Sequence, residues 1–125
     1  MSENTKILIV DDEEISLRTS STILKKKGYN VFTVNTAIGI TDSIDACKPA
    51  LIIMDHDMPQ VSGAEAVIQL KADNKYKQIP IILFSSRYDI EQISATTGAD
   101  AFLQKGIRHY DELIALIKSL TEPLS

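Results

Sequence analysis

Short runs of apolar residues alternate with longer amphipathic segments along the chain. Apolar runs bounded by turn signals, such as 7–10 and 51–54, are typical of strands buried on both faces. The longer segments repeat apolar residues at helical spacing, as Leu113, Ile117 and Leu120 do. In chain order, the pattern predicts strand 6–10, helix 13–27, strand 31–34, helix 37–47, strand 51–55, helix 64–72, strand 81–85, helix 89–97, strand 101–104 and helix 108–120.

Strands and helices that alternate in this way predict an α/β fold with a parallel sheet covered on both faces. Right-handed crossovers leave few possible topologies, and the order 2-1-3-4-5 is the natural one for five strands. We therefore predict a flavodoxin-like (βα)5 doubly wound sandwich. A length of 125 residues suits one core, so we expect residues 1–125 to form a single domain.

Composition narrows the range of partners. Apolar residues make up 44% of the chain and charged residues 24%, which is ordinary for a globular protein. The formal net charge of −4 argues against a general nucleic-acid binder, and we expect no direct contact with nucleic acid. No apolar run approaches the ~18–20 residues of a membrane span. We therefore expect a cytoplasmic protein without a membrane partner.

Polar residues follow several of the predicted strands where each one ends. Asp11 and Asp12 follow the first strand and Asp55 ends the third, and these two strands are neighbours in the predicted order. Ser85 and Lys105 come at the ends of the fourth and fifth strands. Ligands of open parallel sheets bind at this edge. The topology therefore predicts that these side chains converge on one site.

Crowded carboxylates repel one another unless a cation holds them. Magnesium suits such a site because it prefers oxygen ligands and accepts few protein ligands plus water. A carboxylate beside Mg²⁺ can act as a nucleophile toward a phosphoryl group, whose charge Lys105 and the Ser85 hydroxyl would help to stabilise. No Ser–His–Asp set and no glycine-rich phosphate loop is evident in the sequence. This set of carboxylates, lysine and hydroxyl favours phosphoryl acceptance over acid–base hydrolysis.

The same residues carry a family resemblance. The matching features are the acidic pair Asp11-Asp12, the Asp-x-x-Met-Pro pattern at 55–59, Gly63, Ser85 and Lys105. With these features the chain resembles, along nearly its whole length, the receiver domain of bacterial two-component response regulators, in particular stand-alone, chemotaxis-regulator-like proteins.

The resemblance implies a role for each residue of the predicted site. Asp55 would accept a phosphoryl group from a histidine kinase or a histidine phosphotransfer protein. Asp12 and Asp55 would bind Mg²⁺ directly, together with the backbone carbonyl of Asp57, and Asp11 would act through water. The protein would be a phosphoacceptor with at most slow self-dephosphorylation, and not an enzyme.

The resemblance also implies a switch. Ser85 would move to the phosphoryl group, and Phe102 would turn inward into the space released. This would change the surface of the fourth helix, fifth strand and fifth helix, which would bind an unknown downstream protein or pass the group onward. A plain core aromatic is the alternative interpretation of Phe102. The protein would be a monomer or a weak dimer, acting alone or as a fragment of a longer regulator.

The sequence departs from the family pattern in the loops. Gly106 follows Lys105, where the family usually has proline, and predicts a more mobile connection to the last helix. Arg87 and Asp57 are predicted to meet across the mouth of the pocket and to influence the lifetime of the phosphoryl group. The alternative interpretation is two solvated loop side chains. His56 is expected to be a solvated loop side chain.

Two other functions remain open from the sequence. One is a pseudo-receiver, an interaction module that no longer needs phosphate, to which Gly106 leaves room. The other is a haloacid-dehalogenase-like phosphohydrolase, suggested by the Asp55-x-Asp57 pattern. In that family the pattern usually follows the first strand, whereas here it follows the third.

Overall fold

The five strands form one parallel sheet in the order β2-β1-β3-β4-β5, which confirms the predicted topology. The structure is a computed structural model that describes residues 5–106 and 109–122. Its elements are β1 (Lys6–Val10), α1 (Glu14–Lys26), β2 (Asn30–Val34), α2 (Ile40–Cys47), β3 (Leu51–Met54), α3 (Gly63–Ala72), β4 (Ile81–Ser85), α4 (Ile90–Ala95), β5 (Ala101–Gln104) and α5 (His109–Thr121).

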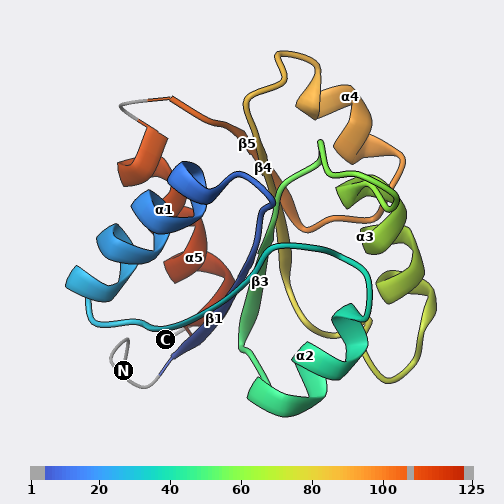
Figure 1. Cartoon of the computed structure of the whole chain (residues 1–125), viewed down its shortest axis with the longest axis horizontal. Helices are drawn as coiled ribbons and strands as arrows, with labels where there is room; N and C mark the ends of the chain where they lie inside the picture. The colour runs from blue at the N-terminus through green and yellow to red at the C-terminus, as the bar shows by residue number, and fades with distance from the viewer. Residues whose placement is uncertain (1–4, 107–108, 123–125) are drawn as a thin grey trace.

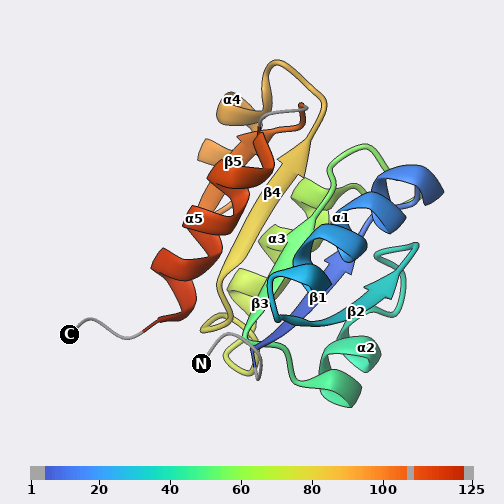
Figure 2. The same cartoon turned by 90° about the vertical axis from the view of Figure 1, so that its left-hand side faces the viewer.

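Helices cover the sheet on both faces. Helices α1 and α5 lie on one face, and α2, α3 and α4 lie on the other (Figures 1 and 2). Because side chains alternate across a strand, Ile7 and Ile9 of β1 pack toward α1 and α5, whereas Leu8 and Val10 pack into the opposite core. Strands β3 and β4 are buried along their whole length in the same way. The three central strands, β1, β3 and β4, therefore form the buried centre of the molecule.

The register of the sheet brings the carboxyl ends of its strands level with one another. Val10 pairs with Met54 across β1 and β3, and the amide of Asp55 donates to the Val10 carbonyl over 2.9 Å. At the other side, the Lys105 amide donates to the Ser85 carbonyl over 2.8 Å. The residues that follow these strands therefore emerge at one edge of the sheet.

The helices differ from the predicted ranges at their ends. Helix α2 begins at Ile40 and not at Ala37, because Gly39 has a φ of 71°, outside the helical region. Helix α4 ends at Ala95, before Gly98 with its φ of 88°. The predicted start of the last helix at Arg108 lies outside the described residues. Within the described ranges, no helix combines the length and apolar character needed to cross a membrane.

Candidate functional site

Three carboxylates meet where β1 and β3 end. Asp11 and Asp55 are buried, with 3% and 8% of their surface exposed, while Asp12 is exposed. One carboxylate oxygen from each of the three lies within 4.8 Å of those of the other two. The predicted convergence of Asp11, Asp12 and Asp55 is therefore present, and its donor set is the oxygen-only kind that hard divalent cations bind.

Lys105 supplies the positive charge within this cluster. Its ammonium donates to Asp11 Oδ2 over 2.8 Å and lies 3.6 Å from Asp55 Oδ1. The other oxygen of Asp11 accepts from the backbone N–H of Glu13 over 3.0 Å. Both oxygens of Asp11 are thus engaged. In the part of the chain that the structure describes, the Asp12 carboxylate has no hydrogen-bond partner.

The electrostatics show that one ammonium does not balance the buried acids. Burial raises the pKa of Asp55 to about 6, against the opposing charge of Lys105 and with help from the negative charge of Asp11. Burial alone would lower the pKa of Lys105, but its hydrogen bond to Asp11 and the charge of Asp55 raise it above the usual value. Lys105 therefore stays charged. A further positive charge in the pocket would be stabilised by the acids that Lys105 does not neutralise.

The acids open into a pocket of ≈ 350 Å³. It is lined by Asp12, Glu13, Asp55, Asp57, Ser86 and Lys105. Ser85 is fully buried and is not among these lining residues, and its hydroxyl oxygen accepts from the backbone N–H of Arg87 over 3.3 Å. The sequence did not single out Glu13 or Ser86. Each directly follows a residue that it did single out, and this is the signal that could have found them.

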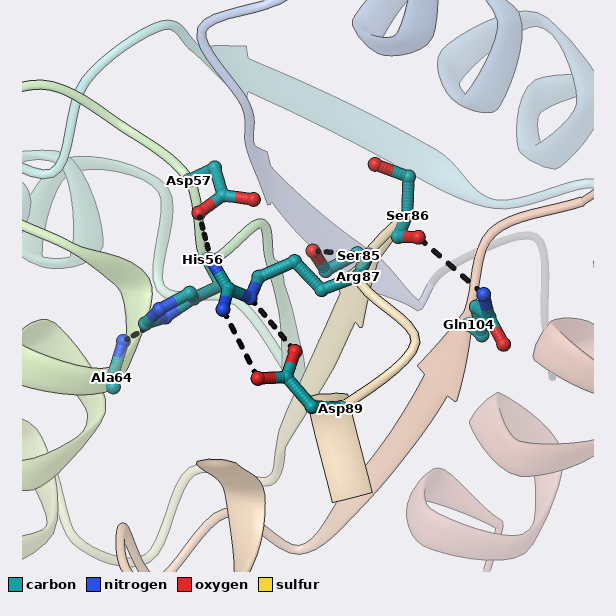
Figure 3. A network of polar contacts seen from close by, with 8 residues as sticks. All are labelled: His56, Asp57, Ala64, Ser85, Ser86, Arg87, Asp89 and Gln104. Carbon is teal, nitrogen blue, oxygen red and sulfur yellow. Dashed lines mark hydrogen bonds and ion pairs between the residues drawn. The ribbon is translucent and has the colours of Figure 1, made fainter. Parts of the chain in front are cut away.

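Arg87 joins the loop after β4 to the loop after β3 (Figure 3). Its Nη1 lies 3.2 Å from Asp57 Oδ1, so the predicted contact is present. Its Nε and Nη2 also donate to the two carboxylate oxygens of Asp89, over 2.9 Å and 3.0 Å. Both acids raise the pKa of the guanidinium, that of Asp89 more strongly. The fork to Asp89 was not predicted, although an acid two residues from an arginine in a loop is a recognisable signal.

The loop after β3 folds tightly against the start of α3. The Gly63 amide donates to the His56 carbonyl over 2.9 Å, and a Cβ at Gly63 would overlap the backbone carbonyl of Asp55. His56 is half-buried, and its Nδ1 accepts from the Ala64 amide over 3.3 Å (Figure 3). The expectation of a solvated His56 was therefore wrong, because the turn brings its ring onto the first turn of α3.

The aromatic side chain of β5 points away from the core. Phe102 is 40% exposed, so the alternative interpretation of a plain core aromatic is wrong. Two residues along the same strand, Gln104 donates through Nε2 to the Ser86 carbonyl over 3.4 Å (Figure 3). One face of β5 therefore carries both the exposed ring of Phe102 and, through Gln104, a contact to the pocket residue Ser86.

Comparison with known proteins points to one family. Residues 7–118 match the response regulator receiver domain family. Protein PilG of Pseudomonas aeruginosa is 28% identical over 120 residues, which cover 94% of this chain and 88% of PilG. The polar-differentiation response regulator DivK of Brucella anthropi is 30% identical over 104 residues, covering 81% of this chain and 84% of DivK.

Solved structures agree with this match. The response regulator protein TrrA of Thermotoga maritima, solved in complex with Mg²⁺–BeF, superposes with a TM-score of 0.85 at 26% identity, over 94% of this chain and 99% of that one. A signal receiver domain of a histidine kinase from Syntrophus aciditrophicus gives a TM-score of 0.84 at 28% identity, over 94% and 90% of the two chains. The likeness covers the sheet and its helices on both faces.

Proposed function

Because the chain belongs to the response regulator receiver domain family, we propose that it is a phosphoryl-accepting switch of a two-component system or phosphorelay, with Asp55 as the acceptor. The observation that supports this most is the arrangement around Asp55. It is a buried carboxylate with a lysine at 3.6 Å, two further acids beside it and a pocket in front of it. In this proposal the protein is a phosphoacceptor and not an enzyme.

The proposed transfer follows from the positions of the side chains. An Asp55 oxygen attacks the phosphorus of a phosphohistidine, the P–N bond breaks, and its electron pair stays on the donor's imidazole. The deprotonated form of Asp55 is the nucleophile, and a pKa near 6 leaves it mostly deprotonated at pH 7. In this proposal Lys105 and the Ser85 hydroxyl would stabilise the charge on the transferred oxygens.

A divalent cation, which we propose to be Mg²⁺, fits the remaining acids. Asp12 and Asp55 would hold it directly with the Asp57 carbonyl, and Asp11 through water. The engagement of both Asp11 oxygens by protein donors, beside an Asp12 carboxylate with no partner among the described residues, supports this division. When bound, the ion would neutralise charge between Asp55 and the incoming phosphoryl group.

We further propose that Ser85 and Phe102 carry the signal outward. The exposed ring of Phe102 would be its position before phosphorylation, with an inward state that alters the surface of α4, β5 and α5. The phosphodonor would be a histidine kinase or histidine phosphotransfer protein, and a downstream protein would read the surface. We propose one receiver domain over 1–125, cytoplasmic and monomeric or weakly dimeric, without nucleic-acid or membrane contacts.

The test of this function is stoichiometric labelling. Incubation with acetyl phosphate and Mg²⁺ should add one phosphoryl group per chain by intact-mass spectrometry, and beryllofluoride with Mg²⁺ should shift NMR signals around the pocket. Both effects should disappear in Asp55→Asn and when EDTA removes the metal. Asp45→Asn is a matched control, because Asp45 lies on α2 and not among the residues that line this pocket, and it should be labelled normally.

Two results would contradict the proposal. Failure of the unmutated protein to bind beryllofluoride with Mg²⁺ would instead favour the pseudo-receiver. Repeated turnover of a generic phosphate ester would favour the phosphohydrolase.

Arg87→Ala should shorten the lifetime of the phosphoryl group. We propose that Arg87, through its ion pair with the pocket residue Asp57, limits the access of water, so its loss should expose the acyl phosphate to hydrolysis. We expect dephosphorylation to accelerate by about fivefold, as for a barrier lowered by roughly 1 kcal/mol. The measurement is the decay of purified phosphoprotein after donor removal. An exposed arginine in a pair with Glu14 provides the control Arg18→Ala, and equal decay in both variants would reject the gate.

A further inference from the structure

The ammonium of Lys105 lies against an aromatic face as well as between two acids. Its Nζ is 5.7 Å from the centroid of the Phe84 ring, within the range of a cation–π contact. Phe84 itself is 2% exposed and belongs to the core that α1 and α5 cover. Lys105 therefore has an apolar neighbour in addition to its acidic partners Asp11 and Asp55.

A second aromatic residue, Tyr110, packs against Phe84. The ring of Tyr110, near the start of α5, contacts Phe84 edge to face, with centroids 5.7 Å apart and an interplanar angle of 73°. The Tyr110 hydroxyl lies 2.9 Å from the hydroxyl of Ser20, a buried residue of α1. Edge-to-face pairs and buried hydroxyls with a partner hold aromatic rings in defined orientations. Phe84 is thus packed against Tyr110 of α5, and Tyr110 is in turn held by Ser20 of α1.

The backbone around Lys105 gives it less support. Its amide is paired with the Ser85 carbonyl, but Gly106 follows directly, and glycine allows more backbone conformations than any other residue. A long lysine side chain also loses rotational freedom when its charged end is held in one place. A side-chain contact that restricts the ammonium therefore compensates for the freedom of the backbone at this position.

From these contacts we infer that Phe84, supported by Tyr110, is a positioning residue that holds the Lys105 ammonium in line with Asp55 for phosphoryl acceptance. The part of the inference that concerns phosphoryl acceptance rests on the proposed function. The part that concerns the position of the Lys105 ammonium rests on the geometry alone. In this role Phe84 acts through Lys105 and not as a metal ligand. Its loss should therefore affect the step that uses Lys105 and leave metal binding as it is.

The experiment compares Phe84→Leu with Phe84→Tyr and with Ile82→Val. Leucine removes the ring, tyrosine keeps it, and Ile82→Val removes a similar volume from the same strand and the same core while every aromatic residue is kept. We expect labelling by acetyl phosphate at saturating Mg²⁺ to slow by about five- to tenfold in Phe84→Leu, the effect of losing one part-buried cation–π contact. Phe84→Tyr and Ile82→Val should keep the normal rate, and the Kd for Mg²⁺ should stay unchanged in all three.

A spectroscopic measurement tests the placement independently of the reaction. A proton near the face of an aromatic ring is shifted by its ring current, so the ε-CH2 protons of Lys105 should move toward ordinary lysine values in Phe84→Leu only. Equal slowing in Phe84→Leu and Ile82→Val, or an unchanged ε-CH2 shift in Phe84→Leu, would overturn the inference. If the unmutated protein is not labelled at all, the proposed function fails, and the ε-CH2 shift still decides whether Phe84 places Lys105.

Discussion

Gly63→Ala should lower the free energy of unfolding by about 3 kcal/mol, the upper part of the range for forcing an extra carbon into a packed site. The added Cβ would overlap the carbonyl of Asp55, which is backbone and has no rotamer to escape into. Either the turn that holds His56 against Ala64 or the end of β3 would have to move. The same shift would displace the Asp55 carboxylate, so beryllofluoride binding should weaken as well.

Urea unfolding followed by circular dichroism measures this effect, with Gly39→Ala as the control. Gly39 has a φ of 71° but no heavy atom within 4 Å of an added Cβ, so alanine there brings backbone strain of about 1 kcal/mol and no overlap. The comparison separates the two reasons for which a chain needs glycine. Equal losses in the two variants would mean that the loop adapts and that close approach is unimportant at Gly63.

Asp55→Asn should make the metal-free protein more stable at pH 7.5, by about 2 kcal/mol, although it removes the proposed acceptor. The pKa of Asp55 is about 6 in the folded protein and 3.8 ordinarily. The folded state therefore binds this proton more tightly than the unfolded chain. The contribution of Asp55 to stability is largest below about pH 4, falls as the pH rises from 4 to 6, and is lost above that.

Unfolding in EDTA across pH 4 to 8 tests this prediction. The advantage of Asp55→Asn should be small at pH 4 and reach its full value above pH 6. Asp57→Asn is the matched control, since Asp57 is exposed and paired with Arg87, and should bring no gain at any pH. Added Mg²⁺ should stabilise the unmutated protein, because only the folded site binds the ion. It should not stabilise Asp55→Asn, because that variant lacks a proposed carboxylate ligand. A difference that stays constant from pH 4 to 8 would contradict the assigned pKa.

The strands and their order could be predicted because local and global signals agree. Residues 51–54 and 81–84 are apolar throughout, and only a sheet covered on both faces buries such runs. The topology then brings Asp11, Asp55 and Lys105 together without any knowledge of side-chain rotamers. Residues that end central strands are thus predictable to the level of a shared site.

Contacts made by loops could not be predicted in the same way. The start of α2 depends on the φ of Gly39, and the position of the His56 ring depends on the turn that ends at Gly63. Neither the φ of Gly39 nor the conformation of that turn is determined by composition. The contact between Phe84 and Lys105 joins neighbouring strands across one face of the sheet, so it depends on register, which a sequence pattern leaves open.

The amide of Asp55 hydrogen-bonds the carbonyl of Val10, so the proposed acceptor and the acidic pair are attached to one backbone ladder. Their separation is set by the spacing between strands, about 4.8 Å, and not by the size of any core side chain. Apolar residues of β1 and β3 can therefore be exchanged over evolutionary time without moving the carboxylates relative to each other. Sequence divergence to 28–30% identity, as seen with PilG and DivK, is compatible with an unchanged spacing of these acids.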